Sequence, residues 1–392
     1  MLLLFNNCVE EIEFNDSSFD KLLVVQAALT DEYKIHEVKL SRISTLNAAE
    51  VVDTHEENAI VSIIEDSQIT YNFQEKAHGV YESISPFKAV FGKQYSLQIK
   101  TPDGEIYEST LEEIQGINNI DEVYAEPDTD FYGVEGLTIS VKSTSCDKNA
   151  KYYKYTYTET YKIIAPYYSK FALRVLSDVF PWKVEKYYQN EDREVCYNTI
   201  NSKKIIQTET SSLSENKVIL PVRFIKKNDT IIAHRYSIEV KQHVQSYEAY
   251  TYFKTLSKLS HTENVFSQTQ QGFLQGNVMP TVNQKNKVVG FFEVNSTSKK
   301  RLFFNHTDLF PDHYINTRTS CEVFAPPLFQ THPTGFYTDF SPLVNAIKAG
   351  YLYTEDNGAP SDNLPGPFQI TTKKCGDCRV DGSIVKPNFW ID

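Results

Sequence analysis

The segment QYSLQIKTPDGEIYES, residues 94–109, decides the fold class of this chain. Its apolar residues Tyr95, Leu97 and Ile99 alternate with polar residues, and a period of two is typical of a β-strand with one buried face. The following turn, Thr101–Gly104, combines a proline, which presets its own φ, with a glycine, which tolerates a positive φ. The segment therefore predicts a β-hairpin.

Short strands of the same kind extend outward from this hairpin. Leu22–Val25 is an apolar run, and Ala59, Val61 and Ile63 alternate with polar or small residues. About seven strands in roughly ninety residues is the spacing of an immunoglobulin-like sandwich, although the Cys and Trp signature of true immunoglobulin domains is absent. The strand order also resembles the small regulatory-type sandwich attached to many carboxypeptidases and outer-membrane receptors. We predict an immunoglobulin-like β-sandwich over residues 21–115.

Residues 116–392 are predicted to form a larger antiparallel β-rich domain. Leu137, Ile139 and Val141 alternate, and a row of tyrosines follows with Thr and Glu between them. Tyrosines on one face of a strand pack against a sheet or a ligand, and we favour packing because each phenol keeps a polar tip at the rim. The tyrosines and the further predicted strands are Tyr153, Tyr155, Tyr157, Tyr161, Lys204–Thr208, Val218–Lys226, Ile231–Val244, Val288–Val294 and Arg301–Phe304.

One or two short helices interrupt this sheet-forming sequence. Residues 246–260 carry apolar side chains at intervals of three and four, and Ser246 is a suitable N-cap. A second helix is predicted at Ser341–Ala349. Beyond Cys321 the chain is rich in Pro, Gly and Asn, which favours long surface loops.

Charge and composition exclude several classes of protein. The 392 residues contain 51 Asp and Glu against 39 Lys and Arg, a net charge of -12 that repels nucleic-acid phosphates. No window approaches the ~18 to 20 apolar residues of a membrane-spanning helix. Nucleic acid is therefore not an expected partner.

The first twenty residues are predicted to be the remnant of a signal, a lipidated cysteine and an acidic tether. Met1–Phe5 is apolar and is followed closely by Cys8, as at the end of a bacterial lipoprotein signal, so a basic leader and more apolar residues are expected upstream. Asn6 and Asn7 replace the usual small residues before the cysteine. We expect lipidation of Cys8, with an ordinary N-terminus and an incidental thiol as the alternative. Residues 9–16 are rich in acidic side chains and favour an extended tether.

The sequence contains no phosphate-binding loop, dinucleotide glycine cluster, paired metalloprotease histidines or nucleophile elbow. We therefore predict no catalytic residue, no cofactor and no metal. Two polar clusters contain residue types that bind metals. His306, Asp308, Asp312 and His313 suit zinc, but a polar loop after a strand is the favoured interpretation. Glu126, Asp128 and Asp130 suit calcium, but their spacing favours a solvated linker.

Cys375 and Cys378 form the sharpest local feature, CGDC. Four interpretations compete: a disulfide within the loop, half of a zinc site, a redox pair, or two thiols that pair elsewhere. If Cys8 is acylated, the protein lies in an oxidising envelope, and structural disulfides are then expected. We predict that Cys375 and Cys378 are disulfide-bonded. With Cys146, Cys196 and Cys321 the number of remaining cysteines is odd, so at least one thiol stays free or pairs outside the chain.

A set of short motifs occurs in a fixed order along nearly the whole chain. They are LVVQAALTD (23–31), VKLSR (38–42), TPDGEIYES (101–109), EAYTYF (248–253), GNV (276–278), VGFF (289–292), KR (300–301), CGDCR (375–379) and KPNFW (386–390). In this order they resemble the Bacteroidetes domain-of-unknown-function family 4249, from about Glu10 to the end. The resemblance implies a surface-directed lipoprotein that is commonly encoded beside outer-membrane receptors driven by the TonB system. It implies no substrate and no catalytic residue.

The leading hypothesis is a lipid-anchored outer-membrane protein, facing the cell exterior, that is a non-enzymatic accessory of a TonB-dependent receptor and captures or gates its cargo. The cargo is unknown. The alternative is a free-standing adhesion or glycan-binding module, in which exposed tyrosines and Trp390 stack on sugar rings. The third hypothesis, a hydrolase, requires carboxylates or a triad that converge in a cleft.

Overall fold

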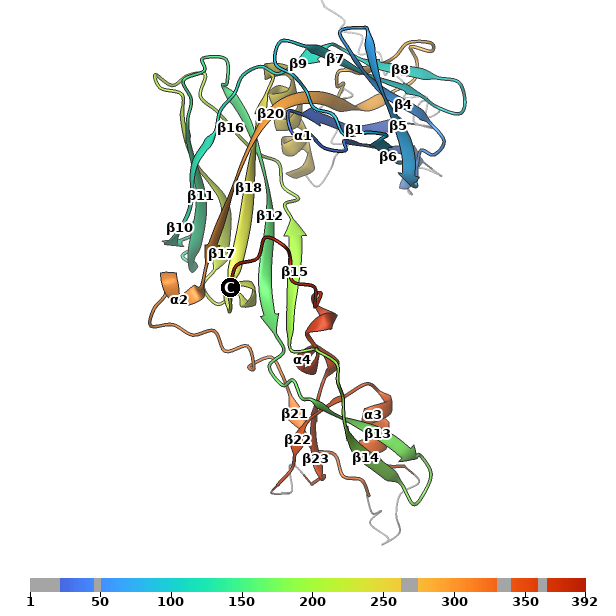
Figure 1. Ribbon diagram of the computed structural model, residues 1–392, viewed down its shortest axis with the longest axis vertical. Coiled ribbons are helices and arrows are strands. Elements are labelled where there is room, and N and C mark those ends of the chain that lie inside the picture. The colour runs from blue at the N-terminus through green and yellow to red at the C-terminus, as the bar shows by residue number, and fades with distance from the viewer. Residues whose placement is uncertain (1–21, 46–50, 262–273, 330–339, 359–364) are drawn as a thin grey trace, which may run out of the picture.

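The protein is built mainly from β-strands, as predicted, and forms three units (Figure 1). The computed structural model describes residues 22–45, 51–261, 274–329, 340–358 and 365–392. An N-terminal sandwich and a middle sandwich lie side by side, and a smaller distal unit extends from the middle sandwich (Figure 1). No helix in these described ranges is long and apolar enough to cross a bilayer.

The N-terminal sandwich consists of two antiparallel sheets that meet at one shared strand. In one sheet β1, β2, β6 and β5 are neighbours, and in the other β5, β4, β7 and β8 follow in order. Strand β5 pairs with β4 through its first half and with β6 through its second half, so it passes from one sheet to the other. The strands are β1 Leu22–Thr30, β2 Glu37–Thr45, β3 Val51–His55, β4 Ile60–Glu65, β5 Ile69–Ala77, β6 Val80–Ser83, β7 Gln94–Lys100, β8 Ile106–Ser109 and β9 Glu112–Glu113.

The predicted hairpin joins β7 to β8. Tyr95, Leu97 and Ile99 are completely buried in the core between the two sheets. The turn is closed by a hydrogen bond from the Thr101 amide to the Glu105 carbonyl, and Gly104 has a φ of +88°. Alternation and turn chemistry together therefore predicted this element correctly.

Two strands from far along the chain complete the N-terminal sandwich, which therefore extends beyond residues 21–115. Strand β19 (Val278–Pro280) pairs with β8, and the first half of β20 (Val288–Phe304) runs parallel to β1. Parallel pairing requires a long crossover between the two strands, and here that crossover contains the rest of the N-terminal sandwich and every strand of the middle sandwich except β20. Nothing local in the sequence indicates such a pairing.

The middle sandwich packs a four-stranded sheet, β15-β12-β18-β20, against a three-stranded sheet, β10-β11-β17. Leu137, Ile139 and Val141 are buried between them, as are Tyr153 and Tyr155, which confirms that these tyrosines pack in a core. The strands are β10 Ile120–Thr129, β11 Glu135–Thr144, β12 Tyr152–Ile164, β15 Val195–Asn201, β16 Ile206–Glu209, β17 Lys217–Lys226 and β18 Tyr236–Gln245; a 3₁₀ turn, η2, spans Thr230–Ile232.

Strand β20 belongs to both sandwiches. Its residues 288–295 pair with β1, and its residues 296–304 pair with β18. The sequence predicted two separate strands here because residues 295–300 are polar and look like a loop. In the folded chain their alternate side chains lie on the outer face of the middle sheet, where polar residues are tolerated.

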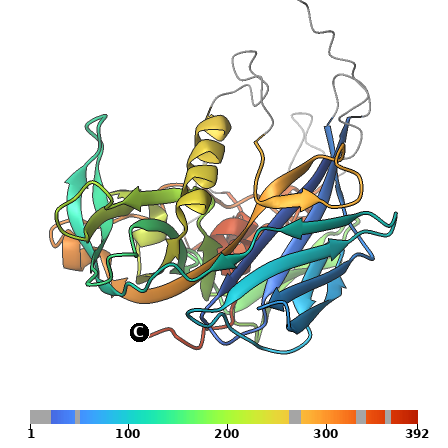
Figure 2. The ribbon, with the colours of Figure 1, turned by 90° about the horizontal axis from the view of Figure 1, so that it is seen from above.

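Helix α1 (Tyr247–His261) lies between the two sandwiches, as the view from above shows (Figure 2). The Ser246 hydroxyl accepts a hydrogen bond from the Ala249 amide at 3.2 Å, which confirms the predicted N-cap. Ala249 and Tyr252 pack against Phe291 of β20, so the apolar face of the helix is a core face.

The distal unit contains a hairpin, β13 (Phe171–Ser177) and β14 (Lys183–Tyr188), and a three-stranded sheet, β21-β23-β22. The predicted second helix is α3, which begins after the N-cap Ser341 and ends before Ala349. The remaining elements are α2 His306–Leu309, β21 Val323–Phe324, α3 Pro342–Lys348, β22 Leu352–Asp356, β23 Phe368–Thr371, α4 Lys373–Gly376 and η3 Cys378–Val380.

Candidate functional site: a charged hollow between the sandwiches

A hollow of about 410 Å³ lies on the outer face of the middle sheet, next to the N-terminal sandwich. Most of the residues that line it are charged or polar. The side chains come from β12, β15, β18 and β20, and they include Lys154, Thr156, Thr158, Asn201, Glu239, Lys241, His243 and Glu293.

Strand register explains why these side chains lie together. Lys154 pairs with His243, Thr156 with Lys241, and Thr158 with Glu239 across β12 and β18. Because side chains alternate between the two faces of a sheet, the residues between them point into the core and these point outward. The sheet therefore presents a polar surface opposite its apolar one.

Three lysines meet at one carboxylate at the edge of this surface. Lys34 and Lys241 contact Glu32 at 3.0 and 2.8 Å, and Lys299 contacts it at 3.5 Å. Partial burial opposes ionisation of Glu32, but hydrogen bonds from Lys241 and Lys34 outweigh it and lower its pKa to about 2. Three ammonium groups against one carboxylate leave a local excess of positive charge, in a chain whose net charge is -12.

His243 lies beside this lysine cluster. Its Nε2 is 3.3 Å from the Thr156 hydroxyl, while its Nδ1 is buried and has no hydrogen-bond partner among the described residues. Burial lowers the pKa of His243 well below its usual value, and the charges of Lys154 and Lys241 lower it further. The ring is therefore neutral at physiological pH, and its buried Nδ1 remains without a partner among the described residues.

The other carboxylates of the hollow are held in ion pairs. Lys154 pairs with the buried Glu293, which also accepts a hydrogen bond from Gln245 at 2.9 Å. Arg301 pairs with Glu239 at 3.1 Å. These contacts fix the walls of the hollow and leave its neutral hydroxyl and amide groups facing the open space.

The described residues around His243 do not form a nucleophilic triad. In a nucleophilic triad a histidine joins a hydroxyl to a carboxylate, which orients the ring. His243 contacts the Thr156 hydroxyl, but its second nitrogen has no carboxylate partner in the described part of the chain. The hollow can hold a ligand through charge and hydrogen bonds.

Comparison with known proteins places the chain in a family. The family described as a domain of unknown function (DUF4249) matches residues 9–301, well over half of the chain. The chain belongs to the DUF4249 family. No curated protein matches it. The matched range of this DUF4249 protein contains every residue that lines the hollow, from Ala28 to Glu293.

The candidate zinc cluster is only partly assembled. His306 Nε2 lies 2.8 Å from His313 Nδ1, so the two imidazoles do meet. Asp308, however, accepts a hydrogen bond from the Asn305 amide in a capping box at the start of α2. In the ranges that the structure describes, no three His, Cys, Asp or Glu side chains are grouped as a metal ion requires.

Two acidic residues of the candidate calcium site, Asp128 and Asp130, form hydrogen bonds within the β10–β11 hairpin. Asp128 accepts a hydrogen bond from the Thr138 hydroxyl at 2.6 Å, and Asp130 accepts from the amides of Tyr132 and Val134 at the turn. These side chains stabilise a hairpin rather than converge on a cation.

The cysteines form two disulfides, but not between Cys375 and Cys378. Cys378 pairs with Cys196, and Cys375 pairs with Cys321. Both cysteines are therefore in disulfides, as in the interpretation in which each pairs elsewhere, and not in a disulfide within the loop. The break between α4 and η3 directs the two side chains to different neighbours. Cys146 is exposed and is not in a disulfide. Cys8, the expected lipidation site, lies outside the described residues.

Trp390 is not an exposed platform for sugar rings. It is 5 % exposed and packs edge-on against Tyr197 and Phe303. The C-terminal segment therefore covers part of the middle sheet. Trp390 is not available to stack on sugar rings as the adhesion hypothesis requires.

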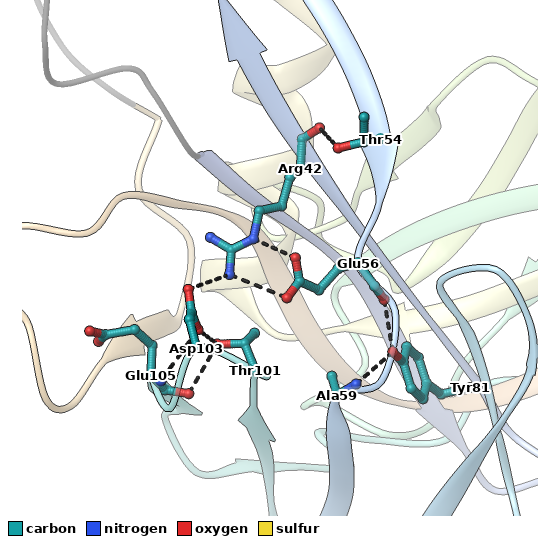
Figure 3. Close-up of polar contacts among 8 residues, drawn as sticks. All are labelled: Arg42, Thr54, Glu56, Ala59, Tyr81, Thr101, Asp103 and Glu105. Carbon is teal, nitrogen blue, oxygen red and sulfur yellow. Dashed lines mark hydrogen bonds and ion pairs between the residues drawn. The ribbon is translucent and has the colours of Figure 1, made fainter.

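A second polar cluster, in the N-terminal sandwich, is structural. Figure 3 shows the Arg42 guanidinium between Glu56 and Asp103, with Tyr81 donating a hydrogen bond to the Glu56 carbonyl at 2.7 Å. Arg42 comes from β2, Glu56 follows β3, and Asp103 lies in the turn between β7 and β8. The charges satisfy one another and tie three segments together.

Proposed function

We propose that this DUF4249 protein is a cell-surface lipoprotein of the outer membrane that binds cargo for a TonB-dependent receptor and catalyses no reaction on it. The hollow between the two sandwiches carries the proposal, because it is large enough for a small ligand and has an excess of positive charge at one edge. Cargo capture needs a preformed polar site of this kind.

The disulfides support a location outside the cytoplasm. Cys196–Cys378 and Cys321–Cys375 join segments that are 182 and 54 residues apart in sequence. Disulfides of this kind persist in oxidising compartments and are rare in the cytosol. A lipid on Cys8 would then attach the protein to a membrane through the acidic segment that follows.

Gentle purification of tagged full-length protein from its native outer membrane tests the proposal. We expect a receptor to copurify in stoichiometric amount, and intact mass to show acyl chains on Cys8. The Cys8→Ala variant is the matched control and should leave the membrane fraction while retaining both disulfides. Wild-type protein found loose in the cytosol with reduced thiols would contradict the proposal.

A specific observation favours the adhesion hypothesis as a second candidate. Phe131 and Tyr132, at the turn between β10 and β11, are 96 % and 87 % exposed, and their ring centroids are 5.5 Å apart. Exposed aromatic rings stack on flat apolar surfaces such as sugar rings. Retention of the wild type on a glycan array, and its loss in Phe131→Ser/Tyr132→Ser, would favour adhesion over cargo capture.

A further inference from the structure

The hollow is organised in rows that cross the strands. Lys241 on β18 and Thr156 on β12 line the hollow in one row, and Lys299 on β20, directly opposite Lys241, extends this row beyond the lining to Glu32. The next row contains Asn201, Thr158 and Glu239. Neighbouring strands are about 4.8 Å apart, so these rows place ammonium groups and neutral hydrogen-bonding groups side by side.

Two lysines directly opposite each other on adjacent strands repel one another. In this chain Glu32, which reaches across from the N-terminal sandwich, compensates them, but it also serves Lys34. The nearby Asp31 is engaged by the amide and hydroxyl of Thr297, each at 2.8 Å. The lysine row therefore keeps a net positive charge that a ligand can neutralise.

Hydroxyl and amide groups lie next to this charge. The Thr158 hydroxyl donates to the Asn201 side chain at 2.8 Å, and the Ser202 hydroxyl accepts from the Tyr157 amide at 3.0 Å. Tyr157 is only partly buried: it packs against the core of the middle sandwich and is also one of the residues that line the hollow. Most of the other lining residues are charged or polar, so charge and hydrogen bonds are the main means of recognition available here.

We propose that the hollow binds a polyhydroxylated anion, a sugar acid or a sugar phosphate, with its anionic group at Lys241 and Lys299 and its hydroxyl groups along Thr156, Thr158 and Asn201. This inference rests on the proposed binding function and names its ligand class.

The anionic group competes with Glu32 for the same lysines. Removing the Glu32 charge therefore strengthens ligand binding, whereas removing the Lys241 charge weakens it. Opposite effects of these two substitutions on ligand affinity would indicate that Lys241 contacts the ligand. If the ion pair were only structural, both substitutions would disturb the fold and both would weaken binding.

Isothermal titration of the purified full-length chain at low ionic strength tests the inference, with glucuronate, glucose 6-phosphate and glucose as the three probes. We expect at least one anion to bind and neutral glucose to bind at least about tenfold more weakly, since charged hydrogen bonds supply the affinity. A preference for glucuronate identifies a carboxylate ligand, and a preference for glucose 6-phosphate a phosphate ligand.

Three variants complete the experiment. Lys241→Gln should weaken anion binding about tenfold or more, and Glu32→Gln should strengthen it several-fold. Lys76→Gln, at an exposed position on β5 away from the hollow, is the matched control and should change nothing. The inference is overturned if neither anion binds, if glucose binds equally well, or if Glu32→Gln and Lys241→Gln both weaken binding. The titration tests the ligand class, whereas copurification of a receptor tests the proposed function. Either proposal can therefore be contradicted without the other.

Discussion

Arg42 lies where three segments of the N-terminal sandwich meet, and its ion pair is almost completely buried. The Arg42 and Glu56 side chains are 13 % and 10 % exposed. Removing one partner of a buried pair leaves the other charge without compensation, which costs far more than losing an exposed pair. We therefore expect Arg42→Met to lower the free energy of unfolding by about 3 kcal/mol in urea denaturation.

The double variant Arg42→Met/Glu56→Gln should recover much of that loss, since the buried Glu56 charge is removed and only Asp103, which is half-exposed, loses its partner. Lys39→Met is the control on the same strand, because the Lys39–Glu37 pair is exposed and its removal should cost less than about 1 kcal/mol. Equal losses in Arg42→Met and Lys39→Met would show that burial does not decide the energetics of this cluster.

Glu112 gives the junction of the two sandwiches a pH dependence. Burial raises its pKa to about 7, against hydrogen bonds from Asn277 and Ser246, so the folded protein favours the protonated acid. The stabilisation is therefore complete below the unfolded pKa of 4.5 and is lost as the pH rises through 7. Glu112→Gln should raise the free energy of unfolding by up to about 3 kcal/mol at pH 8 and change it little at pH 4.

Urea denaturation of the wild type and Glu112→Gln at both pH values measures this effect. Glu113→Gln, on the same short strand but half-buried, is the control and should differ from the wild type by no more than about 0.5 kcal/mol at either pH. A Glu112→Gln effect that is the same at pH 4 and pH 8 would mean that burial does not change the pKa of Glu112 on folding.

At the scale of elements, the pairing of β1 with β20 depends on two glycines. A Cβ on Gly290 would lie 2.3 Å from the carbonyl oxygen of Val25, and a Cβ on Gly276 would lie 1.6 Å from the carbonyl oxygen of Gly290. Both contacts are with backbone, which cannot move aside without breaking the sheet. Gly290→Ala should therefore destabilise the protein by more than about 3 kcal/mol.

Gly92→Ala is the matched control for this substitution. Gly92 has a φ of +79°, but a Cβ added there would meet no described atom within 4 Å. Only the cost of the left-handed backbone therefore remains, about 1 kcal/mol. Thermal unfolding of both variants compares the two costs. Similar decreases in Tm for Gly290→Ala and Gly92→Ala would indicate that a Cβ at position 290 fits between β20 and β1.

The elements that the sequence predicted are those whose signal is local. Alternation in β7 and β11, the Thr101–Gly104 turn, and the capped helices α1 and α3 all depend on residues within about fifteen positions of one another. The pairing of β20 with β1, and of Cys375 with Cys321, depends on residues that are distant in sequence. Local periodicity carries no information about such partners.

The hollow escaped prediction for the same reason. The polar alternation Glu239, Lys241, His243 is visible in the sequence, but it indicates only a solvated sheet face. The site is defined when Glu32, more than two hundred residues away, reaches the same face. Among the candidate clusters, His306 and His313 did meet because they lie only seven residues apart.

At the scale of the whole molecule, β20 joins the two sandwiches as one continuous strand rather than as a linker. Residues 288–295 and 296–304 hydrogen-bond to strands of different sandwiches without interruption (Figure 1). If one sandwich unfolds, half of β20 therefore loses its pairing partner. The same strand is also part of the other sandwich. The hollow lies beside this strand, so its shape depends on both sandwiches remaining folded together.

We therefore expect the two sandwiches to unfold in one cooperative transition. Native-state hydrogen exchange in increasing denaturant should give β7 of the N-terminal sandwich and β11 of the middle sandwich the same opening free energy. Ser296→Pro, placed where β20 changes partner, removes a backbone donor and should separate the two values. Ser296→Ala keeps that donor and loses only the hydroxyl contact with the Gly116 carbonyl, so the two values should stay together. Different opening free energies in the wild type would mean that β20 transmits no cooperativity and that the hollow is a junction between independent modules.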